Sequence, residues 1–156
     1  MSMSKKMNMN FYHIFIMFTT SFLTQYFIMS WVMDNSIVDF TNSLGKIYLS
    51  FLMGLTMVFS QIFMDTNVNL LFYIILFIFI LIFIYLYRTQ TFIGDKEYLS
   101  DMIEHHSMAL LTSDQILQKT KNRKIKKLAN QIVETQRKEI KEMKDLLVKD
   151  PENAMK

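Results

Sequence analysis

Two adjacent histidines, His105 and His106, lie in the stretch DMIEHHSMAL, together with two methionines and nearby carboxylates. Residues three or four positions apart project to the same side of a helix, so Asp101 and Met102 neighbour His105, and Met108 is also within one turn of it. Imidazole nitrogen with thioether sulfur suits copper, and thioether favours Cu(I), whereas imidazole with carboxylate also suits zinc or iron. The stretch therefore predicts a metal site, with copper as the leading metal.

The composition excludes several other chemistries. The chain has no cysteine, which removes disulfides, thiolate zinc sites and thiol redox reactions. The net charge of +3 comes from mixed signs, and the basic run KNRKIKK has no interleaved aromatic residues, so nucleic acid is not an expected partner. There is no glycine-rich phosphate loop and no nucleophile motif with a base to activate it. We therefore expect a binding protein and not an enzyme.

The charged second half of the chain carries two helical patterns separated by a polar break. In the first, apolar and histidine positions recur every three or four residues up to about Lys119. Asp95 is expected to cap this helix, because its carboxylate can accept from unpaired amides of the first turn. After a break at residues 120–122 a second pattern continues until Pro151, which pushes the preceding residue out of helical geometry. The patterns predict an antiparallel hairpin over residues 95–149.

A turn near Lys121 determines which residues of the two helices face each other. His106 is then expected opposite Gln136, and Met102 opposite Ile140. The predicted metal site combines four ligands from the first helix with four residues that complete or support it. The ligands are His105, His106, Met102 and Met108, and the supporting residues are Asp101, Gln136, Glu139 and Met143. Supporting carboxylates and amides commonly orient an imidazole by accepting its second N–H.

The first half of the chain is apolar and predicts three membrane spans. The third, LLFYIILFIFILIFIYLY, is free of charge over about the length that a helix needs to cross a hydrocarbon core. The three spans are expected at residues 11–32, 47–64 and 70–87. The turn DTNVN before the third is short enough only for antiparallel neighbours. Gly54 in the second span could allow a close helix contact, and a signal peptide is a poorer explanation of the first span, whose apolar stretch is long for a signal core.

Charges beside the spans bear on membrane orientation. Lys5 and Lys6 before the first span favour an inside N-terminus, and three crossings then place the charged half outside. Lys46 and Arg88 would also lie outside, which counts against this orientation. We expect a multi-pass protein of the cell (inner) membrane with an extracytoplasmic C-terminal domain.

The remaining histidine and several other methionines of the chain have ordinary explanations. His13, at the edge of the first span, is expected at the interface between lipid and water. Methionine commonly fills apolar cores, so Met53 and Met57 in the second span, and Met7 and Met9 before the first, are weaker candidates for a Cu(I) path.

The expected fold class is all-α, with five parts along the chain. They are an N-terminal tail over 1–10, a membrane region over 11–88, a linker over 89–94, the hairpin domain over 95–149 and a C-terminal tail over 150–156. Two helices of this length bury only one apolar stripe each, too little for an independent core. The hairpin is therefore expected to become a four-helix bundle by forming a homodimer, with packing on the membrane helices as the alternative.

Two segments, GDKEYLSDMIEHHSMALLTSDQILQ and KLANQIVETQRKEIKEM, resemble the family catalogued as domain of unknown function 305. Its hallmarks are a Met-Ile-x-His-His core on one helix and a Gln-x-x-Glu-Ile-x-x-Met core on the next. Both are present, as Met102, Ile103, His105 and His106 and as Gln136, Glu139, Ile140 and Met143. The three spans leading into RTQTFIGD look like a membrane-anchored branch of that family. The resemblance implies a ferritin-like bundle, usually exported, with links to copper binding and copper tolerance.

Two positions depart from the family pattern. Glu104 stands where many members have proline, and it could add a hard ligand or simply an acid on the helix. Thr112 stands where many have methionine, which weakens the case for a site that holds many copper ions.

The combined expectation is a membrane-anchored copper-binding protein that buffers the metal, contributes to tolerance or hands the metal to a carrier protein. The first alternative is an anchored assembly or partner-docking module, in which the histidines are polar contacts or a pH-sensitive patch. The second is a redox enzyme on a helical bundle, which needs more core carboxylates than the pattern supplies.

Overall fold

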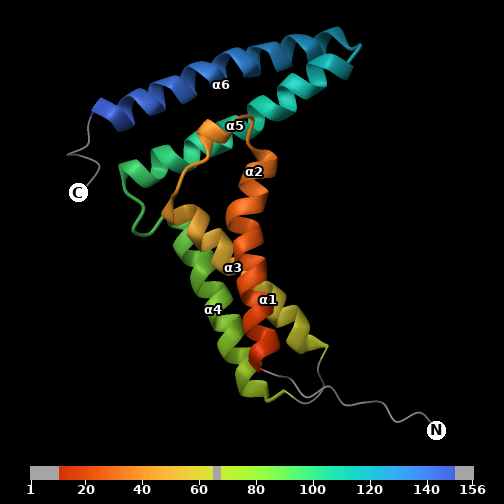
Figure 1. Ribbon diagram of the computed structural model, residues 1–156, viewed down its shortest axis with the longest axis vertical. Coiled ribbons are helices and arrows are strands. Elements are labelled where there is room, and N and C mark those ends of the chain that lie inside the picture. The colour runs from red at the N-terminus through yellow and green to blue at the C-terminus, as the bar shows by residue number, and fades with distance from the viewer. Residues whose placement is uncertain (1–10, 65–67, 150–156) are drawn as a thin grey trace. The chain divides into compact units, whose positions relative to one another are not determined.

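The structure is a computed structural model that describes residues 11–64 and 68–149 (Figure 1). Within those ranges every regular element is helical, which confirms the all-α class. Some predictions concern residues outside the described ranges. They are the predictions for the N-terminal tail over 1–10, which includes Lys5, Lys6, Met7 and Met9, for turn residues 65–67, and for the C-terminal tail over 150–156, which includes Pro151.

The helical elements are shorter in the first part of the described chain and longer from residue 44 onward. Along the described chain they are α1 (Phe11–Leu23), the π-helical η1 (Thr24–Met29), α2 (Ser30–Met33), the 3₁₀ helix η2 (Ile37–Asp39), α3 (Leu44–Phe63), α4 (Leu70–Arg88), α5 (Asp95–Lys119) and α6 (Arg123–Lys149).

Three stretches of helix are long and apolar enough to cross a membrane, by length and composition. They are Phe11–Met33, which joins α1, η1 and α2, then Leu44–Phe63 and Leu70–Arg88. The predicted ranges agree, except that the second helix begins earlier, at Leu44. The prediction began this span after Lys46 because a lysine is unfavourable in lipid, but the ammonium of Lys46 is paired with a carboxylate of α5.

The chain divides into two compact units, the first of which contains described residues up to Tyr26 and the range Ile47–Thr91. Its core is an apolar cluster around Val58, Ile62 and Leu76. Gly54 allows a close contact there, as expected, since a Cβ at this position would lie 2.7 Å from the ring of Phe18.

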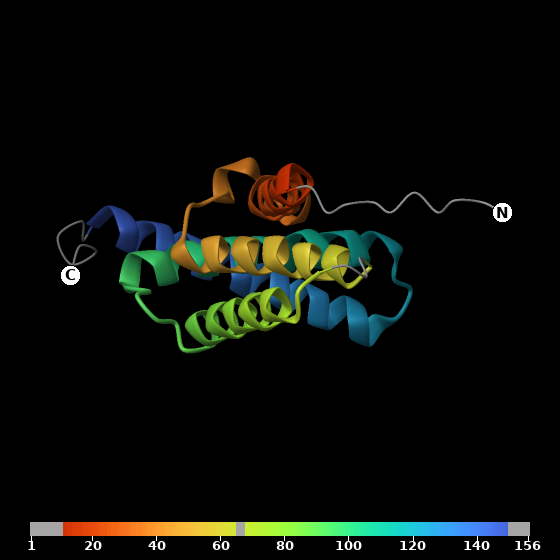
Figure 2. The same ribbon diagram turned by 90° about the horizontal axis from the view of Figure 1, so that it is seen from below.

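The second unit contains the hairpin of α5 and α6, which run antiparallel from a tight turn (Figures 1 and 2). The turn lies at the predicted break: Thr120 ends α5, and the side chain of Asn122 accepts from the amides of Lys124 and Ile125 at the start of α6. Between the helices, Ile103, Leu110, Ile140 and Met143 form the core.

The expected cap of α5 is wrong. Gly94 occupies the N-cap position, where no side chain caps the helix, and Asp95 is the first residue inside α5. With Glu97 it places negative charge in the first turn, where the helix dipole favours it, and this explains the acidic start without a capping bond.

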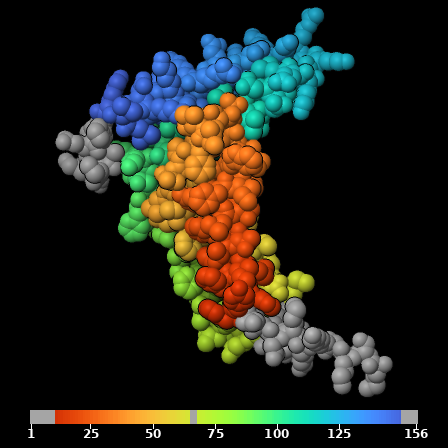
Figure 3. Space-filling view, in the orientation of Figure 1, coloured from red at the N-terminus to blue at the C-terminus, as the bar shows by residue number. Residues whose placement is uncertain are grey.

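A segment from the apolar half of the sequence also belongs to the second unit. We call Phe27–Lys46 the inter-span segment, because it links the first two candidate spans. It contains α2, η2 and the first residues of α3, and both α2 and η2 contact α5. Figure 3 shows its orange atoms directly against the teal and blue atoms of the hairpin. The hairpin therefore has a covering element from its own chain.

Candidate functional site

His106 lies on the side of α5 that faces α6, and its imidazole is largely buried. Its Nε2 is 3.4 Å from Oε2 of Glu139, which agrees with the predicted facing positions. The other ring nitrogen, Nδ1, is buried and has no hydrogen-bond partner among the described residues. A neutral imidazole that donates from Nε2 keeps a lone pair on Nδ1, so the ring presents an unused acceptor to the hairpin interior.

Gln136 presents a second unused acceptor from α6. It precedes Glu139 by three residues, so the two side chains share a face of that helix. Its Oε1 is buried and without a partner in the part of the chain that the structure describes. In that tautomer the Oε1 of Gln136 and the Nδ1 of His106 are both acceptors and cannot bond each other, so each requires a donor or a cation.

Two of the candidate methionines lie in the apolar core of the hairpin. Met143 is buried with Ile103, Leu110 and Ile140, and Met102 packs against that cluster. Met102 is also one turn before His106 on α5, so thioether sulfur lies on the same side of the helix as the imidazole.

The remaining candidate residues are placed differently. His105 is exposed, as the divergence of adjacent helix positions requires, and Met108 is half-buried. Asp101 bonds to Ser43 of the inter-span segment. Within residues 11–64 and 68–149 no group of three or more histidine, aspartate or glutamate side chains could hold a metal ion, so a cation here needs amide or thioether ligands as well.

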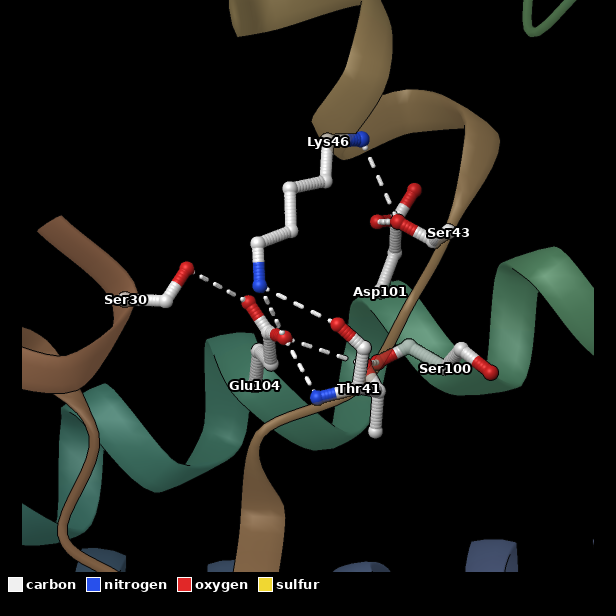
Figure 4. A network of polar contacts seen from close by, with 7 residues as sticks. All are labelled: Ser30, Thr41, Ser43, Lys46, Ser100, Asp101 and Glu104. Carbon is white, nitrogen blue, oxygen red and sulfur yellow. Dashed lines mark hydrogen bonds and ion pairs between the residues drawn. The ribbon is translucent and has the colours of Figure 1, made fainter. Parts of the chain in front are cut away.

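The opposite side of α5 carries a polar network that joins it to the inter-span segment (Figure 4). Glu104 is its centre: Oε1 accepts from the backbone amide of Thr41 at 2.6 Å and Oε2 from the hydroxyl of Ser30 at 3.1 Å. The hydroxyl of Thr41 in turn donates to the carbonyl of Ser100 at 2.8 Å. Glu104 therefore binds backbone and side chains of a segment 63 to 74 positions earlier in the sequence.

Lys46 neutralises Glu104 at close range. Its Nζ lies 2.8 Å from Oε1 of Glu104, and both side chains are largely buried, at 7% and 14% exposure. The same ammonium donates to the carbonyl of Thr41 and lies 3.5 Å from the centroid of the Phe40 ring. A pair this deeply buried is stable only when such additional bonds satisfy the ammonium and the carboxylate.

Asp39 forms a second anchor that reaches both helices of the hairpin. Its side chain, 8% exposed, accepts from the hydroxyl of Ser107 on α5 at 2.7 Å and pairs with Lys144 on α6. Ser107 also accepts from the backbone amide of Asn35 at 2.9 Å. Because Ser107 follows His106 directly, this anchor fixes α5 beside the buried imidazole.

Two carboxyls, one in the inter-span segment and one on α5 facing it, have raised pKa values. Burial, and then the nearby charge of Glu104, raise the pKa of Asp34 to about 6, although Lys46 partly offsets them. Burial also raises the pKa of Asp101, against the opposing hydrogen bond from Ser43. Asp101 lies so close to the backbone of α3 that a Cβ on Gly45 would be 2.0 Å from its Oδ2. A larger residue at position 45 would therefore force the carboxylate of Asp101 to move.

Sequence reasoning did not find this network. The signal available was the spacing of Ser100, Glu104 and Ser107, which places three small or acidic residues on one face of α5. The loop DNSIVDFTNS supplied the matching hydroxyls and carboxylates. Helical periodicity is detected from the spacing of apolar residues. A helix face that packs through polar groups is therefore easily interpreted as exposed to solvent.

Comparison with known proteins places the hairpin in a family. The family model described as domain of unknown function (DUF305) matches residues 92–154. A relative in Acanthamoeba polyphaga mimivirus, named "Uncharacterized protein L153", is 39% identical over 142 residues, which cover 89% of this chain and 93% of that protein. No solved structure matches the chain. The chain therefore belongs to the family of that mimivirus protein and carries, over residues 92–154, the domain of unknown function 305.

Proposed function

We propose that the chain is a membrane-anchored protein that binds a copper ion inside its helical hairpin, with His106 as the principal ligand. It would buffer the metal or hand it to a carrier protein, without catalysis. The ligand shell would consist of Nδ1 of His106, Oε1 of Gln136 and the sulfurs of Met102 and Met143, with Glu139 orienting the imidazole.

The observation that supports this most strongly is the pair of buried acceptors without partners among the described residues, on His106 and Gln136. Leaving a buried polar atom unpaired costs about 1–3 kcal/mol, so a fold that keeps two such atoms buried gains from a bound cation. The carboxylate of Glu139 beside Nε2 matches the usual arrangement of a metal-binding histidine, whose second N–H is held by an acceptor.

Copper is the metal that this donor set favours. Thioether sulfur is a soft ligand that selects Cu(I), and imidazole binds copper, zinc or iron. The half-buried Met102 and buried Met143 would supply the soft donors. His105, which is exposed, would serve an incoming ion at the surface and not the buried centre.

Anchoring of the chain in a membrane is part of the same proposal. Three stretches long and apolar enough to span a membrane precede the hairpin, and we place the hairpin on the extracytoplasmic side, as the lysines before the first span favour. A homodimer would cover apolar side chains that α6 leaves exposed, such as Leu128 and Val148. Light scattering of the detergent-solubilised protein would measure the number of chains per particle.

The test is metal analysis of the full-length protein in detergent after incubation with Cu(I), Cu(II), Zn(II) or Fe(II) and removal of unbound metal. The adjacent histidines provide a matched pair of variants, His106→Ala and His105→Ala. We expect His106→Ala to lose tightly bound copper and His105→Ala to retain it. Equal retention in both, or no copper on the parent protein, would contradict the proposal.

Methionine replacements separate copper from zinc. Met102→Leu and Met143→Leu preserve volume but remove sulfur, and such exchanges usually cost under about 1.5 kcal/mol in stability. Cu(I) affinity should fall in both variants while any zinc affinity stays unchanged. Unchanged Cu(I) affinity would remove thioether from the ligand shell.

A further inference from the structure

Two acids at the contact between the inter-span segment and the hairpin are paired with lysines, whereas Asp34 is not. Glu104 pairs with Lys46, and Asp39 pairs with Lys144. Asp34 differs: both of its carboxylate oxygens are buried, and neither has a hydrogen-bond partner within the described ranges. An ionised carboxylate is not stable in such a position without a proton or a counter-charge.

The position of Asp34 in the backbone makes the negative charge still less favourable. It is the C-cap of α2, and its amide donates to the carbonyl of Ser30 at 2.9 Å. The carbonyl end of a helix carries partial negative charge, which repels an anion, although the effect of so short a helix is small.

The charged groups facing Asp34 come from three elements. They are Glu104 on α5, Asp39 in η2 and Lys46 at the start of α3. Lys46 already binds Glu104, and Asp39 is occupied by Lys144 of α6. Because both lysines are already paired with these acids, an ionised Asp34 adds a further negative charge beside Glu104 and Asp39, and a proton on Asp34 removes it.

We propose that docking of the inter-span segment on the hairpin is proton-dependent, with Asp34 as the group that takes up the proton and docking tightened by mild acid. This function is a pH-sensitive latch between the segment that joins two candidate spans and the helix that carries His106. It does not depend on metal binding, so the two proposals fail or succeed separately.

The direction of the pH effect follows from proton linkage. Burial and Glu104 raise the pKa of Asp34 from 3.8 to about 6 in the docked state. A carboxyl whose pKa is higher when docked binds its proton more tightly there, so docking is strongest below the pKa of the released state and weakens as the pH rises through about 6. A docked pKa of about 6 and a released one of 3.8 predict about a fourfold weaker docking equilibrium at pH 7.5 than at pH 5.5.

The experiment is hydrogen exchange of the full-length protein in detergent or nanodiscs, read at the amides of Thr41 and Asn35. Both amides donate to side chains of α5, so they exchange when the segment opens. Protection is corrected for the intrinsic pH dependence of exchange. In the parent protein the corrected protection should fall about fourfold between pH 5.5 and pH 7.5. A flat profile overturns the proposal.

Asp34→Asn keeps the shape of the side chain and removes its charge. We expect its protection at Thr41 to stay high and independent of pH over this range. Asp145→Asn is the matched control, because Asp145 is an exposed carboxylate on α6, and it should behave as the parent does. A pH profile in Asp34→Asn that equals the parent's would assign the effect to another group and overturn the proposal.

Protection at Ile140, in the hairpin core, reports whether each variant is folded. If Asp34→Asn does not fold, carbon-13 NMR of the aspartate carboxyls in the parent gives the answer directly. The Asp34 carboxyl should titrate with a midpoint of about 6, as burial beside Glu104 predicts. If the Asp34 carboxyl titrates at about 4, the ordinary value of an aspartate, the latch has no proton acceptor in this range.

Discussion

The helix α5 makes two interfaces of opposite character on its two sides. Towards α6 it packs Ile103 and Leu110 into an apolar core. Towards the inter-span segment it presents Ser100, Glu104 and Ser107, each of which is bonded to a residue at least 59 positions earlier in the sequence. The first interface is held by burial of apolar surface and tolerates small shifts, whereas the second requires particular donors and acceptors at particular places.

This difference bears on where function lies. Buried atoms without partners in the described ranges occur at the edges of both interfaces, on His106 and Gln136 beside the apolar core and on Asp34 beside the polar network. Most buried polar groups in folded proteins are paired. These are therefore the positions where a bound ligand or a proton would supply a missing partner. The following changes test the two interfaces against each other.

The largest effect is expected from removing the centre of the polar interface. Glu104→Ala leaves the ammonium of Lys46 buried without its carboxylate, and breaking a buried pair in this way costs about 3–5 kcal/mol. The inter-span segment should lose its exchange protection while the core amides of α5 and α6 keep theirs. Loss of protection throughout the hairpin would mean that the two interfaces are one cooperative structure.

A change of similar size is expected in the apolar interface. Ile103 is 1% exposed, and Ile103→Ala removes buried methyl groups and leaves a cavity, which typically costs about 2–5 kcal/mol. Chemical denaturation followed by circular dichroism would measure the loss in the hairpin. A cost below about 1 kcal/mol would show that the core is loosely packed at its centre.

An intermediate effect is expected at the contact between α3 and α5. Gly45→Ala would place a Cβ 2.0 Å from Oδ2 of Asp101, so the carboxylate has to move and its bond with Ser43 is lost. Forcing an added methyl into such a contact costs about 1–3 kcal/mol. Gly94→Ala is a suitable control, since the nearest atom to a Cβ there is the end of the Glu97 side chain at 3.3 Å.

The smallest effect is expected from an exposed pair that also joins α5 and α6. Nη2 of Arg137 lies 3.3 Å from Oδ2 of Asp114, and the arginine side chain is 63% exposed. Arg137→Ala should change the free energy of unfolding by no more than about 1 kcal/mol, because water screens the pair. An effect as large as that of Glu104→Ala would mean that burial does not explain the difference between the pairs.

Much of this architecture is predictable from the sequence because its signals are local. The three long apolar helices, the turn at residues 120–122 and the position of Glu139 within about one turn of His106 follow from apolar length, polar breaks and helical spacing. Gly54 was a weak signal, and the structure confirms its close contact with Phe18. Such features depend on residues close in the sequence or on the register of one hairpin.

The polar network is not predictable in the same way. Nothing local in the sequence says that Asp39 reaches Ser107 and Lys144, residues 68 and 105 positions away. Their position on the same helix groups Asp101 and Glu104 with the histidines in a prediction from sequence. In the structure both residues bond to the inter-span segment. Spacing along one helix shows which residues are neighbours on that helix. It does not show which residues of a distant loop they bond, because that depends on how the loop folds back.

The most direct test of the account is a pair of double-mutant cycles. Glu104 with Lys46, and Asp114 with Arg137, are each mutated singly and together to uncharged residues, and the coupling free energy is taken from exchange protection. We expect a coupling free energy above about 1 kcal/mol for the buried pair and a coupling free energy near zero for the exposed pair. Equal couplings, or none between Glu104 and Lys46, would contradict the claim that α5 has a polar interior face.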